Sequence, residues 1–222
     1  MRPQVAPVHS KVSSFKSETS PLITFAGSHH VIHLSSSGTS ACVWNLDEQQ
    51  TTEAAGEIME GPSGHKLHGF SSDQRGAFVA SLFVRNSSRR SRNCLSIVKL
   101  WGLETLTSAQ EISTSPGYED MATSICLLED GRALLGTFKG RITIWDLDHG
   151  QEAVGAVAAA DESRTVYFHS HSGMVHVIKS ATSSPSMVLS ASHDDTFRLW
   201  DLRAGSCVRI MKAGESVQCA FR

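Results

Sequence analysis

Short apolar stretches separated by polar turns recur along the chain, and several of them alternate apolar and polar residues. The clearest case is 187–205, where Val, Leu and Phe alternate with polar residues on both sides of a turn at 193–195. A period of two is typical of β-strands, and aspartates suit the tight turn of a hairpin. The segment therefore predicts two antiparallel strands, 187–192 and 196–200, followed by a second turn at Gly205.

The same kind of pattern predicts further strands, in groups that turn residues separate. They are 22–26, 31–36 and 40–46; 77–84 and 94–103; 124–128, 133–137 and 141–145; and 174–179 and 207–211, which flank the hairpin. The strand at 77–84 is nearly continuously apolar, which predicts that both of its faces are buried. The sequence therefore predicts an all-β fold.

Tryptophans end four of these predicted strands at positions 44, 101, 145 and 200, so they are 44 to 57 residues apart. The last two begin related hexamers, WDLDHG and WDLRAG. The residue before each tryptophan is aliphatic: Val43, Leu100, Ile144 and Leu199. Because neighbouring side chains point to opposite faces of a strand, this spacing suits sheets that are packed on both sides.

These tryptophan-ended strands resemble WD repeats, units of about 40–45 residues that form the blades of β-propellers. The resemblance implies antiparallel four-stranded blades over residues 21–222, with units near 21–60, 66–114, 121–157 and 171–212. Insertions at 85–93 and 156–165 would account for the longer spacings. Residues 1–20 are expected to form a flexible arm, and 216–222 a stub of another blade.

Four units and a stub are few for a closed ring, because an open stack leaves apolar faces bare at both ends. We therefore expect an incomplete propeller. It would be a fragment or short isoform of a longer one, or a chain that closes its ring with a partner. A small four-bladed ring is the alternative.

His171, Ser192, Asp194 and Trp200 are the first candidate site. A serine, a histidine and an aspartate are the parts of a hydrolase triad, but Ser192 lies outside any GxSxG sequence. In WD repeats, a histidine before the first strand, a serine or threonine on the second, an aspartate in the turn and the tryptophan form a buried hydrogen-bond chain. The resemblance therefore implies a structural role for these four residues and no catalytic residue. A serine hydrolase is the alternative.

The segment 188–203 also resembles a box found in WD-repeat substrate receptors of cullin-type ubiquitin ligases. That box consists of aliphatic residues, three small residues, an acid, further aliphatic residues and Trp-Asp-x-Arg. The resemblance implies that Asp201 and Arg203 bind a partner, with the planar guanidinium of Arg203 offered to an adaptor. Many ordinary WD repeats fit the same pattern, so Arg203 as a solvated turn residue stays open.

Composition narrows the partners and the chemistry. The net charge of −2 gives no general case for nucleic acid or an anionic membrane. The arginine-rich segment 85–93 lacks interleaved aromatic residues, which favours a solvated hairpin over a phosphate site. His29, His30 and His33 have no nearby cysteine or acid at metal-ligand spacing, and the five cysteines form no CxxC pair. We expect no metal, no cofactor and reduced thiols in an intracellular protein, cytoplasmic or nuclear.

These observations predict a protein-interaction scaffold without enzymatic activity, whose loops between blades bind peptides or domains of other proteins. A substrate receptor of a cullin-type ubiquitin ligase is the first alternative, and a serine hydrolase the second. The most apolar run, 153–160, is far shorter than the roughly 20 residues of a membrane-spanning helix, so no membrane partner is expected.

Overall fold

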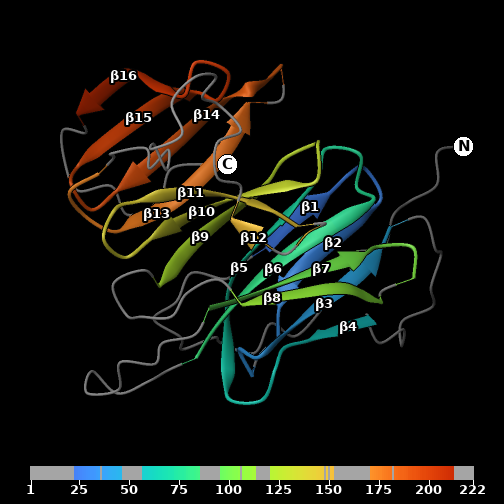
Figure 1. The fold of residues 1–222 in the computed structure, drawn as a ribbon. Helices are drawn as coiled ribbons and strands as arrows, with labels where there is room; N and C mark the ends of the chain where they lie inside the picture. The colour runs from blue at the N-terminus through green and yellow to red at the C-terminus, as the bar shows by residue number, and fades with distance from the viewer. Residues whose placement is uncertain are drawn as a thin grey trace, which may run out of the picture.

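The computed structural model describes residues 23–35, 37–46, 57–85, 96–105, 107–113, 121–147, 149, 151–152, 171–181 and 183–212. These residues form four sheets of four strands, and each strand pairs antiparallel with the next one along the chain (Figure 1). The predicted all-β architecture is therefore confirmed. The expected arm at 1–20, the stub at 216–222, the insertion at 156–165 and residues 86–93 of the arginine-rich insertion lie outside the described residues.

The strands follow the chain from sheet 1 to sheet 4. Sheet 1 consists of β1 (Ile23–Ala26), β2 (His30–Leu34), β3 (Ser40–Asn45) and β4 (Glu57–Glu60). Sheet 2 consists of β5 (His65–Ser72), β6 (Phe78–Arg85), β7 (Ser96–Gly102) and β8 (Ser108–Ser113). Sheet 3 consists of β9 (Ala122–Leu127), β10 (Arg132–Thr137), β11 (Ile142–Asp146) and β12 (Gln151–Glu152). Sheet 4 consists of β13 (Val175–Ala181), β14 (Ser184–Ser192), β15 (Thr196–Asp201) and β16 (Ser206–Lys212).

Four of these strands have no counterpart in the sequence-based prediction. Three of them, β4, β8 and β12, are the last strands of their sheets and contain at most two large apolar residues each, in the sequences EIME, SAQEIS and QE. An edge strand pairs through its backbone on one side only and needs no apolar pattern, so such a strand leaves little signal. In β5, a register shift between Leu67 and Gly69 interrupts the alternation that a regular strand would show.

The hydrophobic cores lie between consecutive sheets. One cluster joins sheets 1 and 2, a second joins sheets 2 and 3, and a third joins sheets 3 and 4. The first strands of the sheets lie side by side, so that β5 contacts β1 and β9, and β9 also contacts β13. In Figure 1, sheet 4 lies at one end of the arrangement, sheet 3 lies next to it, and sheets 1 and 2 overlap at the other end.

The three junctions between consecutive sheets are packed in the same direction along the chain. Trp101 of sheet 2 packs with Ile32 and Val43 of sheet 1. Trp145 packs against the core that sheets 2 and 3 share, and Trp200 of sheet 4 packs with Leu134 of sheet 3. The tryptophan-bearing face of a sheet is therefore turned towards the preceding sheet, and the opposite, aliphatic face is turned towards the following one.

Candidate functional site

His171 lies just before β13, and its backbone is hydrogen-bonded to sheet 3. Its backbone N–H donates a 3.2 Å hydrogen bond to the carbonyl oxygen of Gly140 in the turn between β10 and β11. Gly140 has a φ of 86°, in the left-handed region, and a Cβ atom added to it would collide with the carbonyl oxygen of His171. The position of His171 thus depends on a glycine in the neighbouring sheet.

A chain of side-chain hydrogen bonds runs through the buried face of sheet 4. The indole Nε1 of Trp200 donates to Ser190 Oγ at 2.8 Å, and Ser190 Oγ lies 2.7 Å from His171 Nε2. On the other side of the ring, His171 Nδ1 lies 3.0 Å from both carboxylate oxygens of Asp194. Because a carboxylate can only accept, Nδ1 carries the proton, and Nε2 accepts from the serine hydroxyl. Every polar atom of the chain is then paired.

Ser192, which the sequence pattern places in this chain, is not its hydroxyl member. The Ser192 hydroxyl donates to the carbonyl oxygen of Gly173 at 2.8 Å and accepts from the N–H of Asp194 at 3.2 Å. Register explains the correction. Ser190 is opposite Arg198, two residues before Trp200, so it is the diagonal neighbour of the indole on the same face. Ser192 lies two residues further along β14 and cannot reach the indole.

The electrostatics of the chain keep the aspartate charged and the histidine neutral. Burial by itself would raise the pKa of Asp194, but hydrogen bonds from Thr196, from the N–H of Ser172 and from His171 lower it to about 2. Burial lowers the pKa of His171 below its ordinary value, and this outweighs the opposing effect of Asp194. Arg198 lies 3.7 Å from the Asp194 carboxylate and adds a positively charged partner.

The order Ser190, His171, Asp194 has the hydrogen-bond connectivity of a hydrolase triad, but its burial is that of a core element. A nucleophilic hydroxyl has to meet a substrate, whereas Ser190 is 0% exposed and already accepts a hydrogen bond from the indole N–H of Trp200. His171 and Ser192 are buried as well. These hydrogen bonds join β14, β15 and the segment before β13, and every buried polar group in them has a partner.

A second serine–tryptophan pair lies in sheet 2, where the sequence gave no candidate. Trp101 Nε1 donates to Ser81 Oγ at 2.7 Å, and Ser81 is opposite Lys99 as Ser190 is opposite Arg198. If the register of the β6–β7 hairpin were known from the sequence, Ser81 could have been identified as the partner of Trp101. The arginine-rich insertion between the two strands prevents this, because there is no tight turn from which to count the register. Sheet 2 thus repeats the central hydrogen bond of sheet 4.

Sheets 1 and 3 place other residues at the serine position. In sheet 3 the position is taken by Leu135, and Trp145 Nε1 donates instead to Thr143 Oγ1 on its own strand at 3.0 Å. In sheet 1 it is taken by His33, whose ring is stacked on Trp44 with a centroid distance of 6.1 Å. The complete chain from tryptophan to aspartate is described in sheet 4 alone.

Asp201 and Arg203 lie together in the turn after β15, but they play different parts. Asp201 Oδ1 accepts hydrogen bonds from the N–H groups of Arg203 and Ala204, at 2.9 and 3.4 Å, and so caps the turn. The side chain of Arg203 is exposed and forms no ion pair with any described residue. The turn therefore presents a cation on a fixed backbone.

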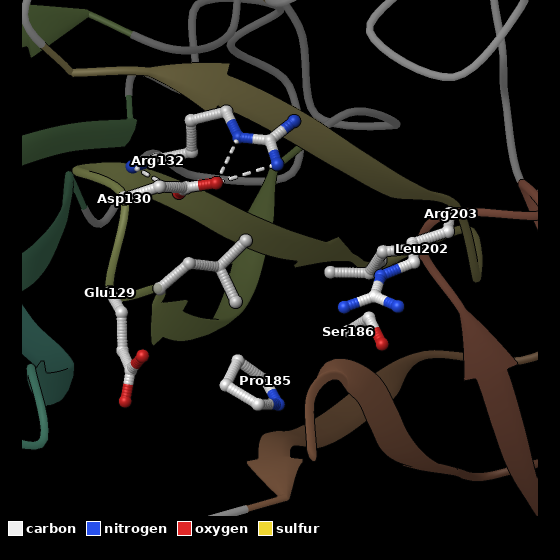
Figure 2. Close-up of a pocket in the computed structure, with 8 residues that line it drawn as sticks. Glu129, Asp130, Arg132, Pro185, Ser186, Leu202 and Arg203 are labelled. Atoms are coloured by element: carbon white, nitrogen blue, oxygen red, sulfur yellow. Dashed lines mark hydrogen bonds and ion pairs between the residues drawn. The ribbon is translucent and has the colours of Figure 1, made fainter.

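Arg203 lines a pocket of about 310 Å³ at the junction of sheets 3 and 4. The pocket is lined by Leu128, Glu129, Asp130, Arg132, Pro185, Ser186, Leu202 and Arg203. Figure 2 shows the residues of sheet 3 along one side and those of sheet 4 along the other. Arg132 is engaged with Asp130 Oδ2 through Nε at 2.9 Å and Nη2 at 2.7 Å. Burial would raise the pKa of Asp130, but these bonds lower it, so the pair stays charged.

The histidine clusters do not assemble into a larger site where the structure describes them. No group of three or more His, Cys, Asp or Glu residues among the described ones is placed to hold a metal ion. The rings of His176 and His193 are 3.6 Å apart between centroids, which brings two such groups together but not a third. In the part of the chain that is described, none of the residues form a helix long and apolar enough to cross a membrane.

Four consecutive antiparallel four-stranded sheets, of which sheets 2, 3 and 4 turn a tryptophan-bearing face to the sheet before, define the fold as blades of a β-propeller. The fold is similar to that of a chain in a solved structure titled "Crystal Structure of Mitotic Checkpoint Complex", with a TM-score of 0.64 and 13% sequence identity. The match covers 96% of this chain and 62% of the other, so this chain spans less than two thirds of that protein's length.

Sequence similarity is confined to a short segment. The chain is 40% identical over 40 residues to the Polycomb group protein FIE1 of Zea mays, which is 18% of this chain and 9% of the relative. No protein-family model matches the chain. The similarity to known proteins therefore establishes the fold, while the function has to be argued from the site.

Proposed function

We propose that this protein is a protein-interaction scaffold without catalytic activity, and that the pocket between sheets 3 and 4 binds a peptide segment of a partner. The observation that carries the proposal is the position of Arg203. Its side chain is exposed, has no ion-pair partner among the described residues and borders a pocket whose lining includes Leu128 and Leu202. An available cation beside apolar side chains is the arrangement that protein interfaces use for recognition.

The chemistry of the pocket selects a class of peptide. A guanidinium binds a carboxylate through two parallel hydrogen bonds, and Arg203 is the cation of the pocket that a ligand can use, because Arg132 is already held by Asp130. Leu128, Leu202 and Pro185 favour an apolar side chain. The proposed ligand is thus an acidic residue with an apolar neighbour. Since Asp201 fixes the turn, the backbone at Arg203 is already ordered, and only the side chain has to be ordered on binding.

The experiment is a screen of purified protein against an array of acidic–apolar peptides, followed by titration of the best binders. We expect Arg203→Glu to weaken binding about tenfold or more, because it removes a charge-assisted bidentate contact. Arg209→Glu is the matched control, since Arg209 is an exposed arginine of β16 outside the pocket. If no peptide binds, or if both variants bind with unchanged affinity, the pocket is not the binding site.

A substrate receptor of a cullin-type ubiquitin ligase is a second candidate, and the exposed Arg203 beside the turn-capping Asp201 favours it. In this case the guanidinium would contact the ligase adaptor. Arg203→Ala should then abolish co-purification of the adaptor while the circular dichroism spectrum stays unchanged. Unchanged co-purification would eliminate this candidate and leave the peptide-binding scaffold untouched.

The proposed setting is intracellular. Cys42, Cys126 and Cys207 are free thiols in the structure, and Cys126 is buried. Reduced thiols are the usual state inside cells, where disulfides rarely persist.

A further inference from the structure

The three internal junctions follow one rule. The tryptophan face of a sheet packs on the aliphatic face of the sheet before it, and the aliphatic face is built around the residue that precedes the tryptophan and its cross-strand partner. These pairs are Val43 with Ile32 in sheet 1, Leu100 with Ala80 in sheet 2, and Ile144 with Leu134 in sheet 3. All six side chains lie in or against the cores between sheets.

Sheet 1 has a tryptophan face that no described sheet covers. Trp44 is 40% exposed, whereas Trp101 and Trp200 are 5% and 3% exposed at the same position of their sheets. Val31 is paired with both Trp44 and Phe25, which places the three side chains on one face. Phe25 and Ile23, two residues apart on β1, are largely exposed. The tryptophan face of sheet 1 thus presents exposed apolar side chains.

Sheet 4 has the complementary, aliphatic face at the other end. Leu199 precedes Trp200 and is paired with Leu189, the same relation that Val43 has to Ile32. Both leucines are only partly buried, whereas Val43 and Ile32 are buried. Met211, which is paired with Phe197 on the same face, is exposed. The aliphatic face of sheet 4 therefore repeats the central apolar pair of an internal junction, while Lys179 and Arg209 are paired with Leu189 and Leu199 on either side of it.

We infer that two copies of this chain associate head to tail, with the tryptophan face of sheet 1 of one copy packed on the aliphatic face of sheet 4 of the other. Each copy carries both halves of the contact, so two copies form two identical junctions. Such heterologous contacts close into a ring when the rotation allows it. The four described sheets of each copy together give eight, within the usual range of 4–8 blades in a propeller. Each new junction continues the packing rule of the internal ones and buries exposed apolar surface.

The test is the molar mass of the full chain in solution, measured by light scattering during size-exclusion chromatography. The chain has a mass of 24.0 kDa, so the ring predicts about 48 kDa. The double substitution Ile23→Glu and Phe25→Glu should return the mass to 24.0 kDa, because it puts two charges on the tryptophan face. Phe78→Glu is the matched control, since Phe78 is exposed on internal sheet 2 and should leave the doubled mass intact.

A mass of 24.0 kDa for the unaltered chain at micromolar concentration overturns the inference, and so does a doubled mass that survives the double substitution. Larger open polymers overturn the closed ring. The direction of packing is tested with Ile23→Cys and Lys179→Cys proteins, which should form a disulfide when mixed in the presence of a mild added oxidant, because first strands lie side by side at internal junctions. A mixture in which Arg209→Cys replaces Lys179→Cys should not, since β16 is the last strand of its sheet. Equal cross-linking of both mixtures contradicts the head-to-tail arrangement.

Discussion

The indole N–H of Trp200 donates a 2.8 Å hydrogen bond to the hydroxyl of Ser190, and this bond joins β15 to β14 inside the core. His171 and Asp194 extend the contact to the segment before β13 and to the β14–β15 turn. One continuous set of hydrogen bonds thereby fixes three parts of a blade that are distant in sequence. Its contribution to stability can be measured by removing one member at a time.

Ser190→Ala should lower the free energy of unfolding by about 2 kcal/mol, because it leaves the indole N–H of Trp200 and Nε2 of His171 buried without a partner. Urea unfolding followed by tryptophan fluorescence measures the change. Ser183→Ala is the control, since Ser183 is exposed in the turn between β13 and β14 and loss of its hydroxyl should cost less than about 0.5 kcal/mol. Equal effects of the two substitutions would show that the hydrogen-bond chain through Ser190 makes no measurable contribution to the free energy of unfolding.

Stability should fall as the solution is acidified, first through the histidine and then through the aspartate. Burial lowers the pKa of His171 from 6.5, so below pH 6.5 the unfolded chain takes up a proton that the folded chain does not. The contribution is complete above pH 6.5 and is lost below it. The pKa of Asp194 is lowered from 3.8 to about 2, so its contribution is complete above 3.8 and is lost as the pH falls through the folded value.

Urea unfolding at a series of pH values tests both windows. Burial also lowers the pKa of His68 and His176, so the first window is shared, and the specific readout is the difference between the unaltered chain and His171→Gln. We expect a shallower loss of unfolding free energy below pH 6.5 in His171→Gln. Asp194→Asn should be less stable at neutral pH and should lose less stability below pH 3.8. Parallel pH profiles of all three proteins would contradict these assignments.

Gly140→Ala should destabilise the fold by about 2 kcal/mol or more, because the new methyl group meets the carbonyl of His171 in addition to the strained backbone. Gly38→Ala separates the two effects. Gly38 also has a positive φ, of 70°, but a Cβ atom there has no neighbour within 4 Å. It should therefore cost only about 1 kcal/mol of backbone strain. Thermal unfolding of both variants measures the two costs. If Gly140→Ala is as stable as Gly38→Ala, the contact between residue 140 and the carbonyl oxygen of His171 has no steric effect on stability.

A fluorophosphonate probe should label neither Ser190 nor Ser192 in the folded protein. Both hydroxyls are buried, and both are engaged in hydrogen bonds to other groups of sheet 4. Mass spectrometry of the digested protein after exposure to the probe gives the result, with an active serine hydrolase as the positive control. A labelled Ser190 would show that the triad-like connectivity is catalytic and that the protein is an enzyme.

The sequence predicts the central strands of the blades well, because these strands are buried and show the required periodicity. The hexamers that begin with Trp145 and Trp200 identify the ends of β11 and β15. The edge strands β4, β8 and β12 could not be found, since their few apolar residues show no alternation and their pairing depends on a neighbouring strand that a local pattern does not reveal. The fold class thus follows from periodicity, whereas the number of strands per blade follows from tertiary pairing.

The choice between Ser190 and Ser192 shows where local reasoning ends. Both are small polar residues on the same face of β14, so residue type does not separate them. Cross-strand register does, because Ser190 is opposite Arg198 and next to the indole of Trp200. Counting outward from the turn at 193–195 would have given this register. The pocket at Arg203 is different in kind, since it arises only when sheet 3 packs against sheet 4.

The most direct test of this account is the hydrogen exchange of the four indole N–H groups, measured by nuclear magnetic resonance on the Ile23→Glu and Phe25→Glu variant. In that variant the tryptophan face of sheet 1 is kept open. The blade arrangement predicts slow exchange for Trp200 and Trp101, whose N–H groups are buried and bonded to Ser190 and Ser81, and the fastest exchange for Trp44. Exchange of Trp200 and Trp101 as fast as that of Trp44 would contradict it.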